Sequence, residues 1–456
     1  MKRLRQDMLS GPLLPSIISY TIPIILTGLL QLLFNAADLV VVGTKGEIYL
    51  SAVGATGAIT NLIVNLFIGL SVGAGVTMAH AMGCRDQEAI HRTVHTALPT
   101  AFIGGVVLTV AGIALSETFL RWMDTPESVL PYSTLYMQIY FGGMVFNMVY
   151  NFGAALLRAA GDTKGPLIYL SISGVVNVVL NLFFVMVFDM TVDGVALATI
   201  ISQGISAVLV VRALMRRTDA ARLQLKKLRI YKTQIFKIVR LGLPAGIQGS
   251  LFSISNVLIQ SSVNSFGEIF MAGNTAAGSI EGFVYVTMNA FHQTALNFTG
   301  QNVGAGQYQR VRKILWICLS CVMAVGILVG GSVYMLREPL LRIYIVDSPN
   351  AAQAIAAGAE RMMYVCLPYF LLGLMDVTTG VLRGLGSSVA PMVISVLGVC
   401  GFRIGWIYTV FATNHTPDTL FISYPISWAL TFLFQLAAFV WIYRKRTASQ
   451  ARLQTP

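Results

Sequence analysis

Long apolar stretches separated by short polar ones run through the whole chain. Twelve of them contain about 20 or more mostly apolar residues, the length that an α-helix needs to cross the hydrocarbon core of a membrane. Strands of a membrane β-barrel are only about ten residues long and alternate apolar with polar positions, so strands are not expected. The pattern predicts an all-α integral membrane fold with twelve transmembrane helices in two groups of six, at residues 14–42, 50–80, 94–115, 132–156, 166–188 and 192–214, then 238–264, 274–302, 314–335, 359–382, 391–411 and 421–443.

The second group of six helices repeats the first. A shift of 221 residues, and later of 225, keeps glycines and prolines aligned over most of both halves, which chance does not do. The aligned pairs are Pro23 with Pro244, Gly46 with Gly267, Gly57 with Gly278 and, after the larger shift, Gly161 with Gly386 and Pro166 with Pro391. Six helices return the chain to the side of the membrane on which it started. We therefore predict two parallel six-helix repeats, related by an axis along the membrane normal.

Lys and Arg residues gather in one set of loops, above all in the central loop from Arg212 to Arg240. Loops on the cytoplasmic side of a membrane carry the excess of basic residues, so both termini are predicted to be cytoplasmic. The few basic residues counted with the outer loops are Lys45, Arg121, Arg337, Arg342 and Arg361. We expect four regions: an N-terminal lobe at 1–215, a basic connector at 216–237, a C-terminal lobe at 238–443 and a cytoplasmic tail at 444–456.

Composition fits this prediction and excludes other classes. Apolar residues make up 55% of the 456 residues and charged residues 11%, where a soluble globular chain carries roughly 25% charged residues. A soluble fold could not hide so much apolar surface, and disorder requires the opposite composition. The net charge of +12 lies in loops, where it suits an anionic lipid surface, so no nucleic-acid partner is expected.

We weigh a transporter against a membrane enzyme. The five His residues form no H-E-x-x-H motif, no Gly-rich phosphate loop follows a strand, and Cys318 and Cys321 have no His or acid beside them. Two lobes around a central cavity can rock between inward and outward openings, which favours a transporter without an enzymatic cofactor. A channel is a further alternative, but it explains the duplicated lobes less well.

Ionisable groups at membrane depth are expensive, so each one inside a predicted helix is a candidate functional residue. Asp38 lies in the first helix, and Asn35 precedes it by one turn on the same face. A carboxyl group in apolar surroundings favours its protonated form, while a nearby cation favours the ionised form. Asp38 can therefore exchange a proton for Na⁺ or for a cationic substrate. The alternative is a partly wet carboxylate near the outer interface that only caps its neighbours.

Three polar residues of the fifth and sixth helices extend this candidate site. Asn177 and Asn181 are four residues apart and share a helix face, so their oxygens can coordinate a cation or bond a neighbouring helix. Thr199 adds a hydroxyl group from the sixth helix. We expect no metal site apart from a Na⁺ site at Asp38, Asn177 and Asn181.

The second half keeps two acids inside its helices, Glu281 in the eighth and Asp376 in the tenth. They could form a second cation or proton site. Alternatively, either acid pairs with Arg403, an otherwise unexplained charge in the eleventh helix, and breaking such a pair would cost about 3–5 kcal/mol. The residues that we expect to line the substrate cavity are Asn35, Gln248, Asn256, Tyr285, His292 and Arg403.

Five segments of the chain carry a resemblance to a known family. They are IPIILTGLLQLLFNAADLVVVG, LLRAAGDTKGPLIYLSISGVVNVVLN, LGLPAGIQGSLFSISNVLIQSSVNSFG, TGQNVGAGQYQRVRK and VLRGLGSSVAPM, in family order over both halves. With these segments the whole chain resembles the bacterial multidrug and toxic compound extrusion (MATE) transporters. The resemblance implies a V-shaped pair of six-helix bundles that exports organic cations, often drug-like, by antiport against H⁺ or Na⁺.

The resemblance also implies roles for particular residues. In one branch of the family, a helix-one aspartate and polar residues of helices five and six form a cation site, at positions that match Asp38, Asn177, Asn181 and Thr199. The family residue matching Asn181 is commonly an aspartate, so Asp38 alone is left here to titrate. In another branch the opposite lobe uses a helix-seven glutamate and a helix-ten aspartate. This chain has no acid in helix seven, and Asp376 lies about one turn from the family position.

Two other kinds of transporter remain as alternatives. The major facilitator group also has twelve helices, but its G-x-x-x-D-R-x-G-R-R motif is missing after the second helix, where this chain reads GCRDQEAIHR. A flippase for a lipid-linked or other anionic substrate would need a strongly cationic cavity, to which only Arg403 could contribute. We expect a multi-pass monomer in a bacterial cytoplasmic (inner) membrane, in contact with lipid and a small cationic substrate.

Overall fold

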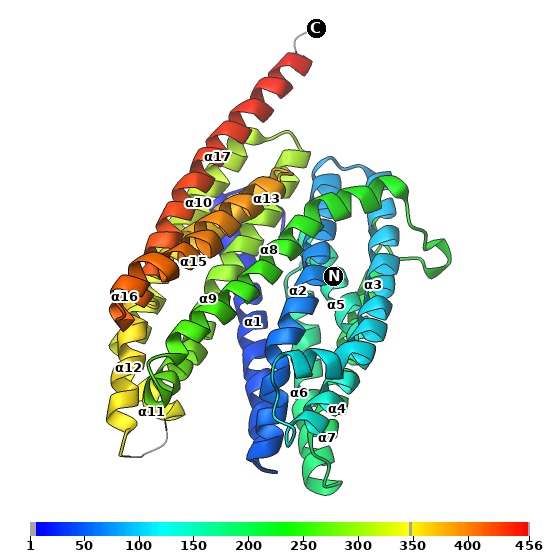
Figure 1. Ribbon diagram of the computed structural model, residues 1–456. Helices are drawn as coiled ribbons and strands as arrows, with labels where there is room; N and C mark the ends of the chain where they lie inside the picture. Colours follow the sequence, from blue (N-terminus) through cyan, green and yellow to red (C-terminus); the bar gives the residue numbers. More distant parts are fainter. Residues whose placement is uncertain (1–5, 346–348, 455–456) are drawn as a thin grey trace. The chain divides into compact units, whose positions relative to one another are not determined.

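The computed structural model describes residues 6–345 and 349–454, and it describes no side chains for 58–59 and 451–454. Within these residues the chain is helical and contains no strand (Figure 1). The first half comprises α1 (Leu13–Gly43), α2 (Glu47–Gly83), α3 (Gln87–Trp122), α4 (Leu130–Gly142), α5 (Met144–Ala159), α6 (Lys164–Leu182) with the π-helix η2 (Phe183–Val187), and α7 (Val192–Met215). The predicted all-α fold class is confirmed.

The second half has the same order of helices with more breaks. It comprises α8 (Lys232–Asn264), α9 (Glu268–Gly304), α10 (Tyr308–Met335), α11 (Arg337–Tyr344), α12 (Ala351–Tyr364), α13 (Phe370–Gly384), α14 (Val389–Ser395), the π-helix η4 (Val396–Gly401), α15 (Phe402–Trp406), the π-helix η5 (Ile407–Phe411), α16 (Pro417–Phe421) and α17 (Ser423–Gln454). Between the halves lies a connector with one short 3₁₀ turn, η3 (Leu225–Lys227).

The repeat predicted from the sequence is visible in the helices themselves. α2 and α9 are both 37 residues long, and each follows a glycine with a positive φ, 135° at Gly46 and 91° at Gly267. Gly161 and Gly386 form a second matching pair, with φ of 88° and 85°, and they lie just after the ends of α5 and α13. A side chain at any of these positions would be strained, because only glycine adopts such backbone angles freely. The aligned glycines therefore mark the ends of matching helices.

Eight helices in the described part of the chain are long and apolar enough to cross a membrane by length and composition, and nine if the pair α4 and α5 counts as one span. That pair bends by 48° at Gly143, where a Cβ atom would lie 2.6 Å from Ile200 of α7. The predicted spans at 238–264 and 274–302 are helical but do not reach the same hydropathy, whereas the predicted span at 359–382 is divided between α12 and α13 by a break at 365–369. Polar side chains lower the hydropathy of the first two: α9 alone buries Asn274, His292, Asn297, Gln301 and Asn302.

The chain packs as two compact units. Unit 1 contains Met1–Asp7 and Ile22–Ser250, and unit 2 contains Met8–Thr21 and Leu251–Pro456. The start of α1 thus packs with the second half of the chain, and the start of α8 packs with the first half. In α1 the change comes just before Pro23, and in α8 it comes nearly two helical turns after Pro244.

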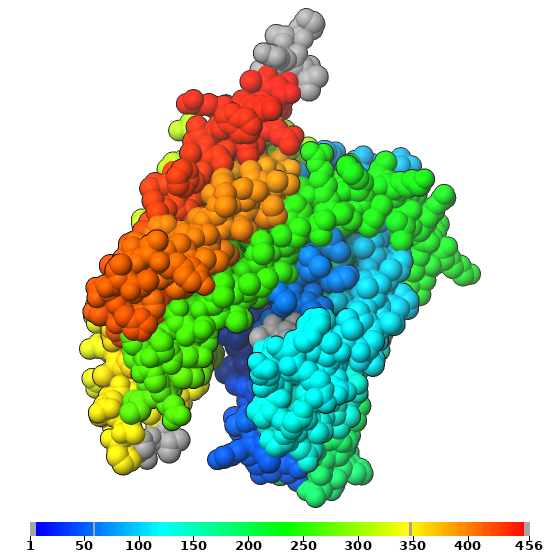
Figure 2. Space-filling view, viewed as in Figure 1, coloured from blue at the N-terminus to red at the C-terminus, as the bar shows by residue number. Residues whose placement is uncertain are grey.

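Close backbone contact holds the start of α8 within unit 1. A Cβ atom at Gly69 of α2 would lie 2.1 Å from the backbone nitrogen of Gly246, and one at Gly73 would lie 2.2 Å from the Ile238 carbonyl. Small residues four apart on both helices allow such an approach. The connector packs on the same unit (Figure 2). Its Gln224 N–H donates to His95 Nε2 of α3 at 3.1 Å.

Candidate functional site

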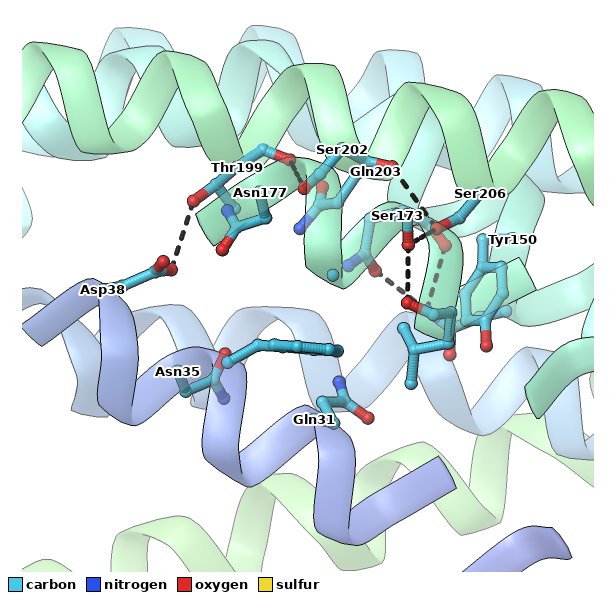
Figure 3. Close-up of a pocket in the computed structure, with 15 residues that line it drawn as sticks. Gln31, Asn35, Asp38, Tyr150, Ser173, Asn177, Thr199, Ser202, Gln203 and Ser206 are labelled. Carbon is cyan, nitrogen blue, oxygen red and sulfur yellow. Dashed lines mark hydrogen bonds between the residues drawn. The ribbon is translucent and has the colours of Figure 1, made fainter. Parts of the chain in front are cut away.

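A small polar cavity opens among α1, α5, α6 and α7 of unit 1 (Figure 3). Its volume is about 90 Å³. Drug-sized ligands occupy pockets of roughly 300–1,000 Å³, and one water takes about 30 Å³, so the cavity suits an ion with a few waters. The lining residues are Gln31, Phe34, Asn35, Asp38, Asn147, Tyr150, Asn151, Leu170, Ser173, Gly174, Asn177, Thr199, Ser202, Gln203 and Ser206.

Asp38 is the single carboxylate among these lining residues, and its side chain is buried. The Asn181 amide donates from Nδ2 to Asp38 Oδ1, and also to Asn177 Oδ1 at 3.2 Å. Thr199 Oγ1 lies 3.3 Å from Asp38 Oδ2 and 2.9 Å from the Val195 carbonyl, so its one proton serves one acceptor at a time. The structure thus brings together all four residues predicted for the N-terminal cation site.

The packing of α1 on α6 explains why these side chains meet. Phe34 of α1 fills the space beside Gly174 of α6, where a Cβ atom would lie 1.8 Å from the Phe34 ring. Asp38 follows Phe34 by four residues, and Asn177 follows Gly174 by three, so each lies on the same helix face as its contact residue. This close approach turns the carboxylate toward the carboxamides.

The cavity contains polar residues that the sequence analysis missed. Ser206 of α7 donates to Ser173 Oγ of α6 at 2.5 Å, and Asn151 of α5 donates to Asn147. Asn147 and Asn151, like Ser202 and Ser206, are four residues apart. The spacing that singled out Asn177 and Asn181 would also have found these two pairs.

In unit 2, Glu281 does not pair with Arg403. Its partner is Arg361 of α12, whose Nη2 lies 2.6 Å from Glu281 Oε2, while the Tyr369 hydroxyl donates to Oε1 at 3.2 Å. Counting Arg361 with the outer loops was wrong, because α12 begins at Ala351 and carries this largely buried arginine, which forms an ion pair with Glu281 of α9. Among the residues that the structure describes, Arg403 has no carboxylate within 4.0 Å, so the alternative in which Glu281 or Asp376 pairs with it is wrong.

Asp376 lies in a second polar cluster of unit 2. Its backbone carbonyl accepts from His292 Nδ1 at 2.7 Å, and His292 Nε2 faces Arg383 Nη1 at 3.5 Å. This geometry assigns the proton to Nδ1 of a neutral His292. Glu281 and Asp376 therefore have different arginines near them.

The six residues expected to line one substrate cavity lie in different places. Asn35 lines the small cavity of unit 1, and Gln248 is buried on the unit 1 part of α8. In unit 2, Asn256 and Tyr285 are exposed, whereas His292 and Arg403 are buried. In the described part of the chain, no three His, Cys, Asp or Glu side chains are grouped to hold a metal ion.

Known proteins resemble this chain over nearly its whole length. The MatE family model matches residues 23–183 and 244–409. The probable multidrug resistance protein YpnP of Bacillus subtilis is 26% identical over 86% of this chain and 87% of its own length. The probable multidrug resistance protein NorM of Thermotoga maritima is 26% identical over 85% of this chain and 83% of its own.

A solved structure shows the same fold. The outward-facing conformation of a multidrug resistance MATE family transporter superposes with a TM-score of 0.88 at 20% identity, covering 98% of both chains. Repeated membrane-spanning helices with buried ionisable groups define a polytopic membrane transporter. The chain belongs to the MatE family, whose members are transporters and not enzymes.

Proposed function

We propose that the protein is a secondary active transporter that exports organic cations or other drug-like compounds by antiport against H⁺ or Na⁺. Its relatives in Bacillus subtilis and Thermotoga maritima are both named probable multidrug resistance proteins, which supports a drug-like substrate. We further propose that it is a monomer in a bacterial cytoplasmic membrane, with both termini in the cytoplasm.

The Asp38 site is the observation that carries the proposed antiport. Antiport requires the coupling ion and the substrate to favour different conformations of one carrier, so that each lowers the affinity for the other. Asp38 is a buried carboxylate beside an ion-sized cavity, and Asn181, Asn177 and Thr199 surround it with groups that can reorient. Binding of a proton or Na⁺ there changes the hydrogen bonds that join α1 to α6 and α7.

The geometry supports both coupling ions. As placed, Asn181 donates to Asp38, while its own Oδ1 is buried and has no hydrogen-bond partner in the described part of the chain. Rotating this amide would turn Oδ1 toward Asp38 and, with Asn177 Oδ1 and Thr199 Oγ1, provide the oxygen ligands that a hard cation prefers. Protonation of Asp38 alone would weaken the same contacts without rotating the amide.

The test is efflux of a fluorescent lipophilic cation from proteoliposomes with an imposed H⁺ or Na⁺ gradient. We expect wild-type protein to use one gradient and Asp38→Asn to lose coupled transport while it stays folded in the membrane. Glu127→Gln is the control, since this exposed carboxylate pairs with Arg121 on the surface of unit 1. Unchanged coupled efflux by a well-expressed Asp38→Asn variant would rule out the N-terminal site.

A flippase for an anionic substrate is the second candidate, because unit 2 buries Arg383 and Arg403 and largely buries Arg361. Glu281 neutralises the first of these charges, and Asp376 lies on the same helix as the second. Absence of cation transport under both gradients would favour this candidate.

A further inference from the structure

Unit 2 buries two arginines, Arg383 and Arg403, and largely buries a third, Arg361, and their charges are not equally neutralised. Arg361 forms an ion pair with Glu281, and Arg383 lies about two helical turns after Asp376 on α13. Arg403 is only 4% exposed, and the described residues place no carboxylate within 4.0 Å of it. Arginine stays protonated in proteins, so unit 2 carries a buried positive charge that no carboxylate of the described residues contacts; Glu281, which pairs with Arg361, acts on it only from beyond 4.0 Å.

Arg403 is held by a hydrogen bond at one edge of its guanidinium group and by aromatic rings near the group. Nε donates to Ser427 Oγ at 2.9 Å, and Cζ lies 3.9 Å from the ring centroid of Tyr424 and 5.5 Å from that of Trp428. These cation–π contacts stabilise the charge only in part. Nη2 is buried and has no hydrogen-bond partner among the residues that the structure describes. Since leaving a buried charged donor unsatisfied is costly, this atom requires a ligand.

An oxyanion fits this position best. A planar guanidinium group that is held by stacking presents its remaining N–H groups in the plane, where a carboxylate or phosphate accepts them. Water would satisfy the N–H groups but would leave the charge unbalanced. The helix on either side of Arg403 is widened, with η4 before α15 and η5 after it. Such π-helical turns frequently occur at functional sites.

We infer that Arg403 binds an oxyanion, a carboxylate or phosphate, of the compound that the protein transports. This inference rests on the proposed function and narrows its substrate class from simple cations to compounds that also carry an acid group. Ser427, Tyr424 and Trp428 are then positioning residues that hold the guanidinium in place.

Binding of two matched dyes to purified protein tests the inference. Tetramethylrhodamine and its methyl ester share the cationic ring system, and only the former has a free carboxylate. In phosphatidylcholine nanodiscs, fluorescence polarisation should give a Kd for the free acid that is roughly tenfold lower or more than that of the ester, as expected for a charge-assisted hydrogen bond. Arg403→Gln should abolish this preference and leave the Kd of the ester unchanged.

Two further variants separate recognition from structure. Arg312→Gln removes an exposed charge of α10 and should keep the preference, which excludes a long-range charge effect. Arg403→Lys keeps the charge but loses the planar fork, and it should retain only part of the preference. Equal weakening of both dyes by Arg403→Gln, or no preference in the wild type, would overturn the inference.

The remaining arms identify the source of the oxyanion and separate this inference from the proposed function. If phosphatidylglycerol in the nanodiscs displaces the free acid from the wild type and has no effect on Arg403→Gln, a lipid headgroup occupies the site, and a site for the transported compound is excluded. If the binding preference holds but neither dye is transported under any gradient, the proposed antiport fails while the oxyanion site stands.

Discussion

At the scale of single residues, the contact between Asn181 and Asp38 is the most distinctive feature of the N-terminal site. Replacing Asn181 by aspartate removes the donor and places a second carboxylate against Asp38. Two carboxylates in contact cannot both ionise without a cation between them. We therefore expect Asn181→Asp to shift the pH of half-maximal efflux upward if H⁺ is the coupling ion, or to lower the half-saturating Na⁺ concentration if Na⁺ is.

The measurement is proteoliposome efflux over a range of pH and of Na⁺ concentration. Asn151→Asp is the matched control, because Asn151 lines the same cavity but hydrogen-bonds to Asn147 rather than to Asp38. Equal shifts in both variants would show that any added acid in the cavity has this effect, and the special role of the Asp38 contact would be lost.

The ion pair between Glu281 and Arg361 is expected to be structural. Glu281→Gln leaves a buried arginine without its counter-ion and should cost about 3–5 kcal/mol of stability. The double variant Glu281→Gln with Arg361→Gln should recover much of that loss, since it leaves no unpaired charge. Thermal unfolding in detergent measures both. A single variant as stable as the wild type would contradict the structural role.

The residues of the Asp38 site could be predicted from the sequence because each is an unusual polar residue within an apolar helix. A carboxylate in an apolar helix and two amides at helical spacing need no tertiary structure to be noticed. Partners across helices are different: nothing local shows that Arg361 faces Glu281, or that Arg403 stacks on Tyr424. The charged residues inside the helices of unit 2 could therefore be predicted, but the partner of each charged side chain could not.

At the scale of elements, the contact between α2 and α8 depends on glycine. Gly69→Ala would place a Cβ atom 2.1 Å from the Gly246 backbone, so the helices must separate, and strain of this kind typically costs about 1–3 kcal/mol. Gly57→Ala on the same helix meets nothing within 4 Å and should be neutral or stabilising, because alanine favours helices by up to about 1 kcal/mol. Thermal stability in detergent compares them, and equal stability would refute tight packing at Gly69.

Hydropathy predicted the positions of the spans but not their internal breaks. The residues around Gly143 are as apolar as their neighbours, so the hydropathy pattern does not predict the bend between α4 and α5. It arises because Gly143 must fit against Ile200 of another helix. The π-helices on either side of Arg403 are equally invisible, since their residues continue the apolar run.

At the scale of the whole molecule, the repeat predicted the plan of the helices but not which segments pack together. Thr21 and Thr294 occupy the repeat positions of Gly242 and Gly73, and their hydroxyl groups lie 2.8 Å apart inside unit 2, where unit 1 has backbone contact between the glycines. The two halves thus have corresponding helix crossings with different contacts: glycine backbones touch in unit 1, and two threonine hydroxyl groups form a hydrogen bond in unit 2. Only the packing shows that the first turns of α1 belong to unit 2.

The orientation of the whole molecule in the membrane can be tested through Cys84. This cysteine lies just after α2 and is exposed, whereas Cys318, Cys366 and Cys400 are buried and Cys321 is only partly exposed. The loop that contains it carries Arg85 and is predicted to be cytoplasmic. A membrane-impermeant maleimide should therefore label the protein in inside-out vesicles and not in intact cells, and Cys84→Ser should abolish the labelling.

A second reporter makes the labelling result decisive. Glu127 is exposed beyond the far end of α3, on the side predicted to be external. In a Cys84→Ser background, Glu127→Cys should react in intact cells, because α3 is long and apolar enough to span the bilayer between the two positions. The reverse pattern, Cys84 reacting from outside and Glu127→Cys only from inside, would place both termini outside. The basic connector would then face away from the anionic leaflet, contrary to the distribution of Lys and Arg in the loops.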